Sequence, residues 1–168
     1  MTKTLTQKEQ IEACYTNIKI KMGMLNYMKV IDLFAGVGGL SLGAARAGFD
    51  VSAAVEIDSH AIETHHVNFP NSRHFMEDVS SIDGKELLKS INLESLDCLI
   101  GGPPCQGFSS IGKGNVDDVR NELYFHFFRI ISEIRPLCFL AENVPGIMNE
   151  KYDPIRNKAL SLIKDDYY

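Results

Sequence analysis

The sequence predicts an α/β fold in which helices wind over both faces of a parallel sheet. Short apolar runs alternate with helical patterns from about residue 28, and glycine or polar residues follow the runs. The predicted strands are Lys29–Phe34, Val51–Glu56, Arg73–Met76, Leu96–Ile100 and Cys138–Ala141. The predicted helices are Leu40–Ala47, Ser59–Asn68, Lys85–Ile91, Glu122–Ile134 and about Pro154–Lys164. This doubly wound order places ligands at the carboxyl ends of the strands.

Length and composition indicate one globular domain. The chain has 168 residues, of which 45% are hydrophobic and 23% are charged, within the size of a single domain. We interpret residues 1–28 as an N-terminal extension and residues 29–168 as the α/β domain. No apolar run approaches the roughly 20 residues of a membrane span, and residues 1–28 lack the apolar core of a secretory signal. We therefore expect a cytoplasmic protein with no membrane contact.

Charge and cysteine usage narrow the classes of function. The net charge is −5, which argues against a large phosphate-binding surface on this part of the protein. The four cysteines occur singly, so neither a zinc site nor a disulfide framework is predicted. We expect no bound metal.

The first predicted strand runs into a glycine turn. In "KVIDLFAGVGGLSLGAARAGF", Gly36, Gly38 and Gly39 open a helix and let the backbone approach a ligand closely. Ser41 occupies the last position of the dinucleotide-binding pattern G-x-G-x-x-G, so the strict pattern is not met. A glycine turn alone is also compatible with a simple connection between strand and helix.

Acidic residues at neighbouring strand ends favour a bound adenosine. Glu56 lies about twenty residues after the turn, where a carboxylate accepts hydrogen bonds from ribose hydroxyls. Asp78 follows the third strand and is available to an adenine amino group. Asp32, just before the turn, would repel a pyrophosphate and attract, directly or through water, the cationic amino-acid end of S-adenosylmethionine. This favours S-adenosylmethionine over NAD.

The stretch "GGPPCQGFS" places a cysteine after the fourth strand. Pro103 and Pro104 stiffen the approach to Cys105, as expected for a nucleophile held at the rim of the sheet. Cys98 and Cys138 lie within apolar strands, and we expect both to be buried. No histidine is clearly paired with Cys105.

The fifth strand ends in "CFLAENV" and supplies a carboxyl group to the same rim. The apolar run predicts a buried strand leading directly into a partly buried Glu142. Such a carboxyl can hold or donate a proton to a ring nitrogen when its pKa is raised.

These motifs together resemble the DNA cytosine-5 methyltransferase family. "DLFAGVGG" is similar to its first motif, "VEID" to the second, "GGPPCQGFS" to the catalytic loop and "ENV" to the motif after it. The resemblance covers about Val30 to Tyr168 and implies a Rossmann-like, S-adenosylmethionine-dependent methyltransferase fold.

The resemblance implies a role for each matching residue. Cys105 would attack carbon 6 of a cytosine flipped out of duplex DNA, and Glu142 would contact its ring nitrogen 3 and exocyclic amine. S-adenosylmethionine would be the cofactor and S-adenosylhomocysteine the product. The implied cofactor-binding residues are Asp32, Phe34, Gly36, Gly38, Gly39, Glu56, Ile57, Asp78, Val79, Pro103 and Leu123. The implied substrate-binding residues are Gln106, Ser109 and Asn143.

Parts of the family pattern are missing. We find no Gln-x-Arg-x-Arg motif, no target-recognition region and no closing helix of the cofactor site, so the domain is expected to be a truncated front portion. A fragment prepared for expression, a truncated gene or one subunit of a split enzyme would each account for this. The alternatives are a non-catalytic subunit that needs a second chain, a tRNA cytosine-5 methyltransferase and, more distantly, a dehydrogenase. An uncovered sheet edge also predicts self-association.

Overall fold

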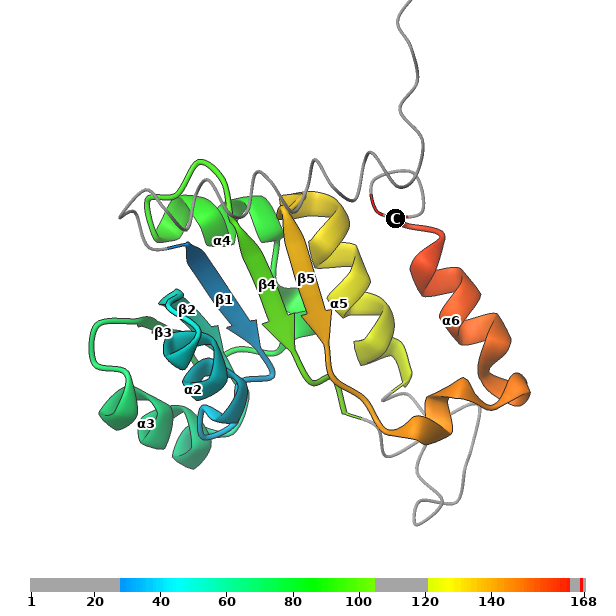
Figure 1. The fold of residues 1–168 in the computed structure, drawn as a ribbon, viewed down its shortest axis with the longest axis horizontal. Helices are drawn as coiled ribbons and strands as arrows, with labels where there is room; N and C mark the ends of the chain where they lie inside the picture. Colours follow the sequence, from blue (N-terminus) through cyan, green and yellow to red (C-terminus); the bar gives the residue numbers. More distant parts are fainter. Residues whose placement is uncertain (1–27, 105–120, 164–166, 168) are drawn as a thin grey trace, which may run out of the picture.

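The computed structural model describes residues 28–104, 121–163 and 167 (Figure 1). It contains a five-stranded parallel sheet in the order β3-β2-β1-β4-β5. The strands are β1 (Lys29–Leu33), β2 (Asp50–Val55), β3 (Arg73–Phe75), β4 (Cys98–Gly101) and β5 (Cys138–Ala141). The α-helices are α2 (Gly39–Arg46), α3 (Ser59–Asn68), α4 (Gly84–Ser90), α5 (Asn121–Ile134) and α6 (Asp153–Leu160), and the 3-10 turns are η1 (Val79–Ser81), η2 (Pro145–Met148) and η3 (Glu150–Tyr152).

The predicted fold class is confirmed. Each predicted strand and helix is present with ends shifted by a few residues, the largest shift being in α6, which ends at Leu160. None of the helices in the described ranges is long and apolar enough to cross a membrane.

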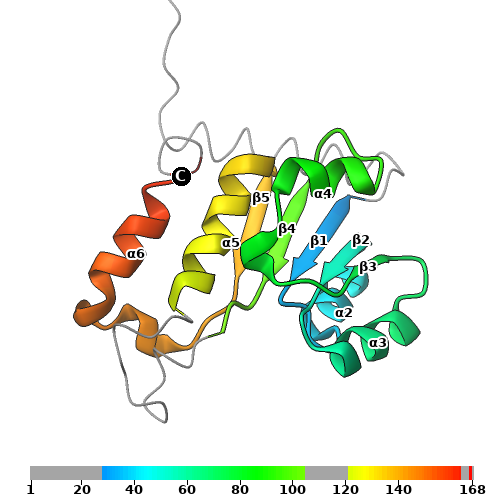
Figure 2. The same cartoon turned by 180° about the vertical axis from the view of Figure 1, so that it is seen from behind.

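The chain reverses its direction across the sheet at β1. It first moves outward from β1 through β2 to β3, and then returns to place β4 on the other side of β1 and β5 beyond it. The ends of β1 and β4 are therefore neighbours at the point where doubly wound folds bind ligands. Figures 1 and 2 show α2 on one face of the sheet and α4 and α5 on the other.

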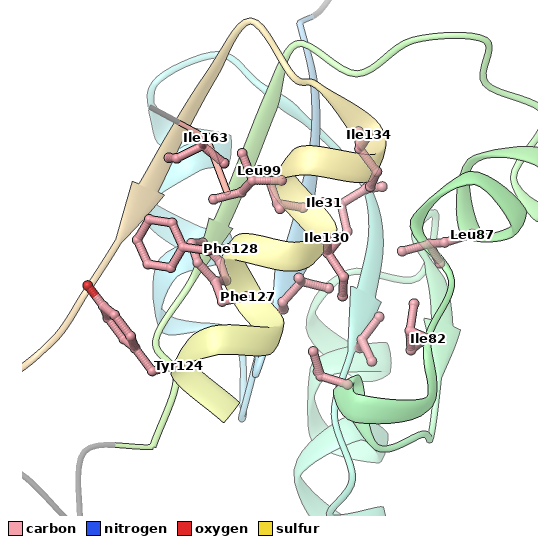
Figure 3. Close-up of a cluster of buried hydrophobic side chains, with 14 of the residues drawn as sticks. Ile31, Ile82, Leu87, Leu99, Tyr124, Phe127, Phe128, Ile130, Ile134 and Ile163 are labelled. Carbon is pink, nitrogen blue, oxygen red and sulfur yellow. The ribbon is translucent and has the colours of Figure 1, made fainter. Parts of the chain in front are cut away.

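The main core lies between the sheet and the helices α4 and α5 that cover one of its faces (Figure 3). Ile31 and Leu99 from the central strands pack with Phe127, Ile130 and the other buried apolar residues of α5. Helix α5 is strongly amphipathic, and its apolar face packs on β1 and β4. β1 leads into the glycine turn, and β4 leads into the cysteine loop. Helix α6 packs against α5, farther from the sheet (Figure 2).

The expectation of a buried fifth strand is wrong. β5 is an edge strand whose first two residues are half-buried and whose last two are exposed, with Leu140 at 51% exposure. Leu140 and Cys138 share one face of β5, and Cys138 is only half-buried, whereas Cys98 on β4 is buried as expected. In the described part of the chain, no helix covers this face beside β5 (Figure 1).

Candidate active site

The glycine turn after β1 is held to the end of β2 by Glu56. Gly36 and Gly38 have φ angles of +53° and +100°, a region that favours glycine. The backbone N–H of Gly36 donates to Glu56 Oε2 and that of Asp58 to Glu56 Oε1, each at 2.9 Å. Glu56 therefore fixes the turn and the start of α3 together, while its oxygens retain lone pairs for further hydrogen bonds.

The side chains around this turn differ in their availability to a ligand. Ile57 is 65% exposed, so it is not a core residue. Phe34 is half-buried, packs against the main core and has a φ of +58°. Gly39 begins α2, and a Cβ placed on it would meet nothing within 4 Å. The exposed Ile57 and the open glycine turn lie beside the Glu56 carboxylate and supply apolar and polar surface together.

The third strand is followed by η1, which presents Asp78. Asp78 is exposed and caps η1 by accepting a hydrogen bond from the backbone N–H of Ser80 at 2.8 Å. The hydrogen bonds from Ser80 lower the pKa of Asp78. The Val79 side chain is 3% exposed and belongs to the core, so only its backbone is available to a ligand.

Arg129 on α5 anchors the backbone of η1. Its Nη2 donates to the Val79 carbonyl at 3.2 Å, and its Nη1 is 2.6 Å from Glu133 Oε1. Glu133 Oε2 in turn accepts from the backbone N–H of Gly84 at 2.7 Å. Sequence reasoning missed this link, and the Arg129–Glu133 spacing of four residues on one helix was the available signal. Leu123, in the first turn of α5, is half-buried.

Asp32 lies beneath the glycine turn and is fully buried. Its Oδ2 accepts a hydrogen bond from Ser41 Oγ at 2.7 Å, and its Oδ1 has no hydrogen-bond partner among the described residues. The pKa of Asp32 is raised to about 6, mainly by burial and to a smaller extent by the nearby Glu56, against hydrogen bonds from Ser41 that lower it. Asp32 is thus placed beneath the turn with one free carboxyl oxygen among the described residues, and its attraction of a cationic ligand group, directly or through water, stays a prediction.

Ser41, at the departure from the glycine pattern, joins Asp32 to histidines. Its Oγ lies 2.9 Å from His65 Nε2, and His65 Nδ1 lies 2.9 Å from His74 Nε2. The sequence gave no sign that these histidines form a polar network with Asp32. The signal was Ser41 itself, a hydroxyl at a position where the pattern has glycine.

The ends of β4 and β5 meet beside the start of the cysteine loop. The backbone N–H of Glu142 donates to the Gly101 carbonyl at 2.9 Å, and a Cβ built on Gly102 would lie 3.2 Å from Glu142 Oε2. Asn143 Nδ2 donates to the Pro103 carbonyl at 3.4 Å. The Glu142 and Asn143 side chains thus both lie against the segment that leads into the loop.

Glu142 is exposed, so the expected partial burial of this carboxyl is wrong. The physical reason is the edge position of β5. Pro103 is buried. Cys105, Gln106 and Ser109 lie outside the described residues, and their predicted roles remain predictions.

The β4 end is packed directly onto the β1 end. A Cβ built on Gly101 would lie 2.5 Å from the Leu33 carbonyl oxygen and 2.8 Å from the Phe127 ring. Glycine at this position therefore lets the start of the cysteine loop run close beside the strand that carries the glycine turn. The predicted cofactor site at the glycine turn and the predicted catalytic site at the cysteine loop therefore share one rim of the sheet.

Comparison with known proteins agrees with this arrangement. The family model for C-5 cytosine-specific DNA methylases matches residues 28–168. The type II methyltransferase M.XorII of Xanthomonas oryzae is 42% identical over 140 residues, which are 82% of this chain and 33% of that protein. M1.HphI of Haemophilus parahaemolyticus is 44% identical over 117 residues, 68% of this chain and 32% of that protein. This chain thus spans about a third of the length of these relatives.

Solved structures give the same result. A protein described as a DNA modification methyltransferase of an Escherichia coli prophage is 60% identical, with a TM-score of 0.74 over 82% of this chain and 38% of that one. A variant of Spodoptera frugiperda DNMT2 is 25% identical, with a TM-score of 0.61 over 83% of this chain and 41% of that one. The resemblance seen in the sequence motifs is confirmed, and the chain belongs to the C-5 cytosine-specific DNA methylase family.

Proposed function

We propose that this chain carries the nucleophile and most of the cofactor site of an enzyme that methylates carbon 5 of cytosine in DNA. The main support is the meeting of the β4 and β5 ends. Glu142 and Asn143 contact Gly102 and Pro103, and Cys105 follows two residues later. Family membership supplies the reaction class to which this geometry is suited.

The residues of the β1–β3 half fit S-adenosylmethionine. A Cβ built on Gly36 would meet nothing within 4 Å, so the turn leaves space for a ligand close to its backbone. Glu56 would accept hydrogen bonds from the ribose, exposed Ile57 would pack on the adenine and Asp78 would accept from its amino group. When bound, S-adenosylmethionine supplies an electrophilic methyl group, and S-adenosylhomocysteine is the product.

The side chains of the β4–β5 half would act on the base. The Cys105 thiolate forms a bond to carbon 6 of cytosine, and the electron pair of the 5,6 double bond makes carbon 5 nucleophilic. Glu142 contacts ring nitrogen 3 and the exocyclic amine and stabilises the charge that develops there, while Asn143, Gln106 and Ser109 help to hold the base. After methylation, carbon 5 loses its proton and the bond to Cys105 breaks, which restores the aromatic ring. The cytosine must leave the duplex because neither ring atom can be reached in line while it is stacked.

The later family motifs and the main DNA-binding surface are expected on a further segment or on a second chain. The chain covers about a third of its relatives, and its net charge of −5 is unsuited to a large phosphate-binding surface. The partners are therefore duplex DNA and a second segment or chain that carries the later family motifs.

Covalent trapping tests this proposal. The chain is incubated with S-adenosylmethionine and duplex DNA that contains 5-fluorocytosine, in which fluorine replaces the proton that must leave. An adduct that survives denaturing electrophoresis is expected with the wild type, is absent with Cys105→Ser, and is reduced with Glu142→Gln.

The controls separate the alternatives. Adduct formation only after addition of a chain with the later motifs would select the subunit that needs a partner. Trapping on a transfer RNA substituted with 5-fluorocytosine but not on DNA would select the RNA enzyme. No adduct under any of these conditions would refute the proposal.

A further inference from the structure

Five polar residues form a continuous path from the interior of the sheet to the surface. Ser41 Oγ lies 2.7 Å from Asp32 Oδ2 and 2.9 Å from His65 Nε2. His65 Nδ1 lies 2.9 Å from His74 Nε2, and His74 Nδ1 lies 3.2 Å from His66 Nδ1. Asp32, Ser41 and His65 are fully buried, His74 is half-buried and His66 is exposed. We call this path the carboxyl–histidine chain.

The carboxyl–histidine chain can be hydrogen-bonded in two opposite directions. In the outward order, a neutral Asp32 donates to Ser41, Ser41 donates to His65 Nε2, and His65 donates from Nδ1 to His74. In the inward order, His74 donates from Nε2 to His65, His65 donates from Nε2 to Ser41, and Ser41 donates to an ionised Asp32. Both orders satisfy every link with neutral histidines, because a neutral imidazole has one donor and one acceptor nitrogen.

The change from the outward to the inward order releases one proton from the path to solvent. As Asp32 gives its proton to Ser41 Oγ, Ser41 gives its own to His65 Nε2. The Nδ1 proton of His65 then goes to His74 Nε2, and the Nδ1 proton of His74 goes to His66 Nδ1. The Nε2 proton of His66 leaves to water. Each ring gains one N–H and loses one, so within the carboxyl–histidine chain only Asp32 changes its charge.

The surroundings favour neutral rings and a proton on Asp32 that can be lost near neutral pH. Burial, followed by the neighbouring His74, lowers the pKa of His65 to about 4. Burial, followed by His66, lowers the pKa of His74. The carboxylate of Glu56 is the charged group of the described residues that acts on Asp32 and helps to raise its pKa.

Apolar residues also lie beside Asp32 and His65. Asp32 pairs in the sheet with Ala54 on β2 and Ile100 on β4. The His65 ring packs against Phe69, with ring centroids 4.7 Å apart. A Cβ built on Gly38 would lie 3.1 Å from the same His65 ring, so the path runs directly beneath the glycine turn.

We propose that the carboxyl–histidine chain exchanges the proton of Asp32 with solvent at His66, and so sets the charge beneath the glycine turn. Ser41, His65 and His74 act as positioning residues that carry the proton without becoming charged. An ionised Asp32 would favour a cationic ligand group at the turn; this consequence rests on the proposed function, whereas the proton path does not.

Histidine tautomers, read by nitrogen-15 long-range correlation spectroscopy of the full chain without cofactor, test the proposal. As the pH rises from 5 to 8, His65 is expected to switch from the Nδ1–H to the Nε2–H tautomer, and His74 to switch with it. Both switches share one midpoint near 6, and neither ring passes through the imidazolium form. A single tautomer of His65 over the whole range, or its conversion to imidazolium above pH 5, would overturn the proposal.

Variants connect the switch to Asp32. Asp32→Asn keeps the shape but removes the titrating proton, so His65 is expected to keep one tautomer at every pH. Ser41→Ala interrupts the path, so the His65 switch is expected to lose its midpoint near 6. His60→Gln is the matched control, since His60 is an exposed residue of the same helix outside the path; the wild-type switch is expected to persist. A switch that survives in Asp32→Asn would also overturn the proposal.

Discussion

The two halves of the sheet present polar residues at the same rim in opposite ways. In the β1–β3 half, Glu56 accepts two backbone hydrogen bonds and Asp32 is fully buried beneath the turn. In the β4–β5 half, Glu142 is exposed and lies against Gly102, at the start of the loop that it is proposed to serve. The difference follows from position, because β1 is central and β5 is an edge strand.

This difference matches the size of the two proposed ligands. A small cofactor benefits from a site that is already formed, since little ordering is then required on binding. The proposed flipped base would arrive attached to a large duplex, so its site would have to stay open until the DNA and the remaining motifs surround it. The surroundings of the exposed Glu142 would then be completed only in that assembly.

The largest effect is expected where the two halves touch. Gly101→Ala places a Cβ 2.5 Å from the Leu33 carbonyl oxygen, a backbone atom that cannot move away cheaply. We expect a loss of about 3 kcal/mol in the free energy of unfolding, measured by urea denaturation.

Gly102→Ala is the matched control. The added methyl group meets Glu142 Oε2 at 3.2 Å, the far end of an exposed side chain, so the change in stability should stay within about 0.5 kcal/mol. Because Glu142 must shift, the yield of the 5-fluorocytosine adduct should fall. Equal losses of stability in the two variants would contradict the close packing of β4 on β1.

The second effect concerns the pH dependence of the free energy of unfolding. Asp32 and His65 contribute to it in opposite directions, so that their effects are hidden in the wild type. The pKa of Asp32 is raised from 3.8 to about 6, so its stabilising contribution is lost as the pH rises from about 4 to 6. The pKa of His65 is lowered from 6.5 to about 4, so its contribution is lost as the pH falls over nearly the same range. Each amounts to about 3 kcal/mol, and the two nearly cancel in the wild type.

Removing either group should expose the other. We expect the stability of Asp32→Asn to rise by about 3 kcal/mol between pH 4 and 6.5, and that of His65→Gln to fall by a similar amount. His60→Gln should follow the wild type. Urea unfolding at several pH values measures this, and parallel curves for wild type and Asp32→Asn would refute it.

The sequence was sufficient for the fold but not for its edge. Short apolar runs that alternate with helical patterns located all five strands, and glycine and acidic residues marked the rim. The run "CFLA" was wrongly interpreted as buried, because a short apolar run does not distinguish a central strand from an edge strand. Burial of a strand depends on neighbours that are distant in the sequence, and periodicity carries no information about them.

The site shows the same limit. Glu56 and Asp78 were predicted because their positions after a strand are local signals. The path through Ser41, His65 and His74 was missed, since it depends on the packing of α2, α3 and β3 around Asp32. The Cys105 prediction falls outside the described residues and rests on its motif.

A smaller effect should separate strain from crowding within the glycine turn. Gly38→Ala combines a φ of +100° with a Cβ 2.7 Å from the Phe69 ring, and we expect a loss of about 2 to 3 kcal/mol. Gly36→Ala has a φ of +53° but nothing within 4 Å of its Cβ, so only the backbone strain of about 1 kcal/mol remains. Thermal unfolding of both variants measures the difference; a Gly36→Ala variant as unstable as Gly38→Ala would contradict it.

The smallest effect on stability is expected at the β5 edge. Leu140 is 51% exposed on β5, which is the last strand of the sheet in the described part of the chain, and an exposed apolar edge favours pairing between copies of a chain. Leu140→Lys should change the free energy of unfolding by no more than about 0.5 kcal/mol yet reduce self-association, measured by sedimentation over a range of concentrations. Val67→Lys alters an equally apolar, exposed residue on α3 and should leave association unchanged. If the wild type stays monomeric at high concentration, or if both variants weaken association alike, the β5 edge is not the surface through which copies meet.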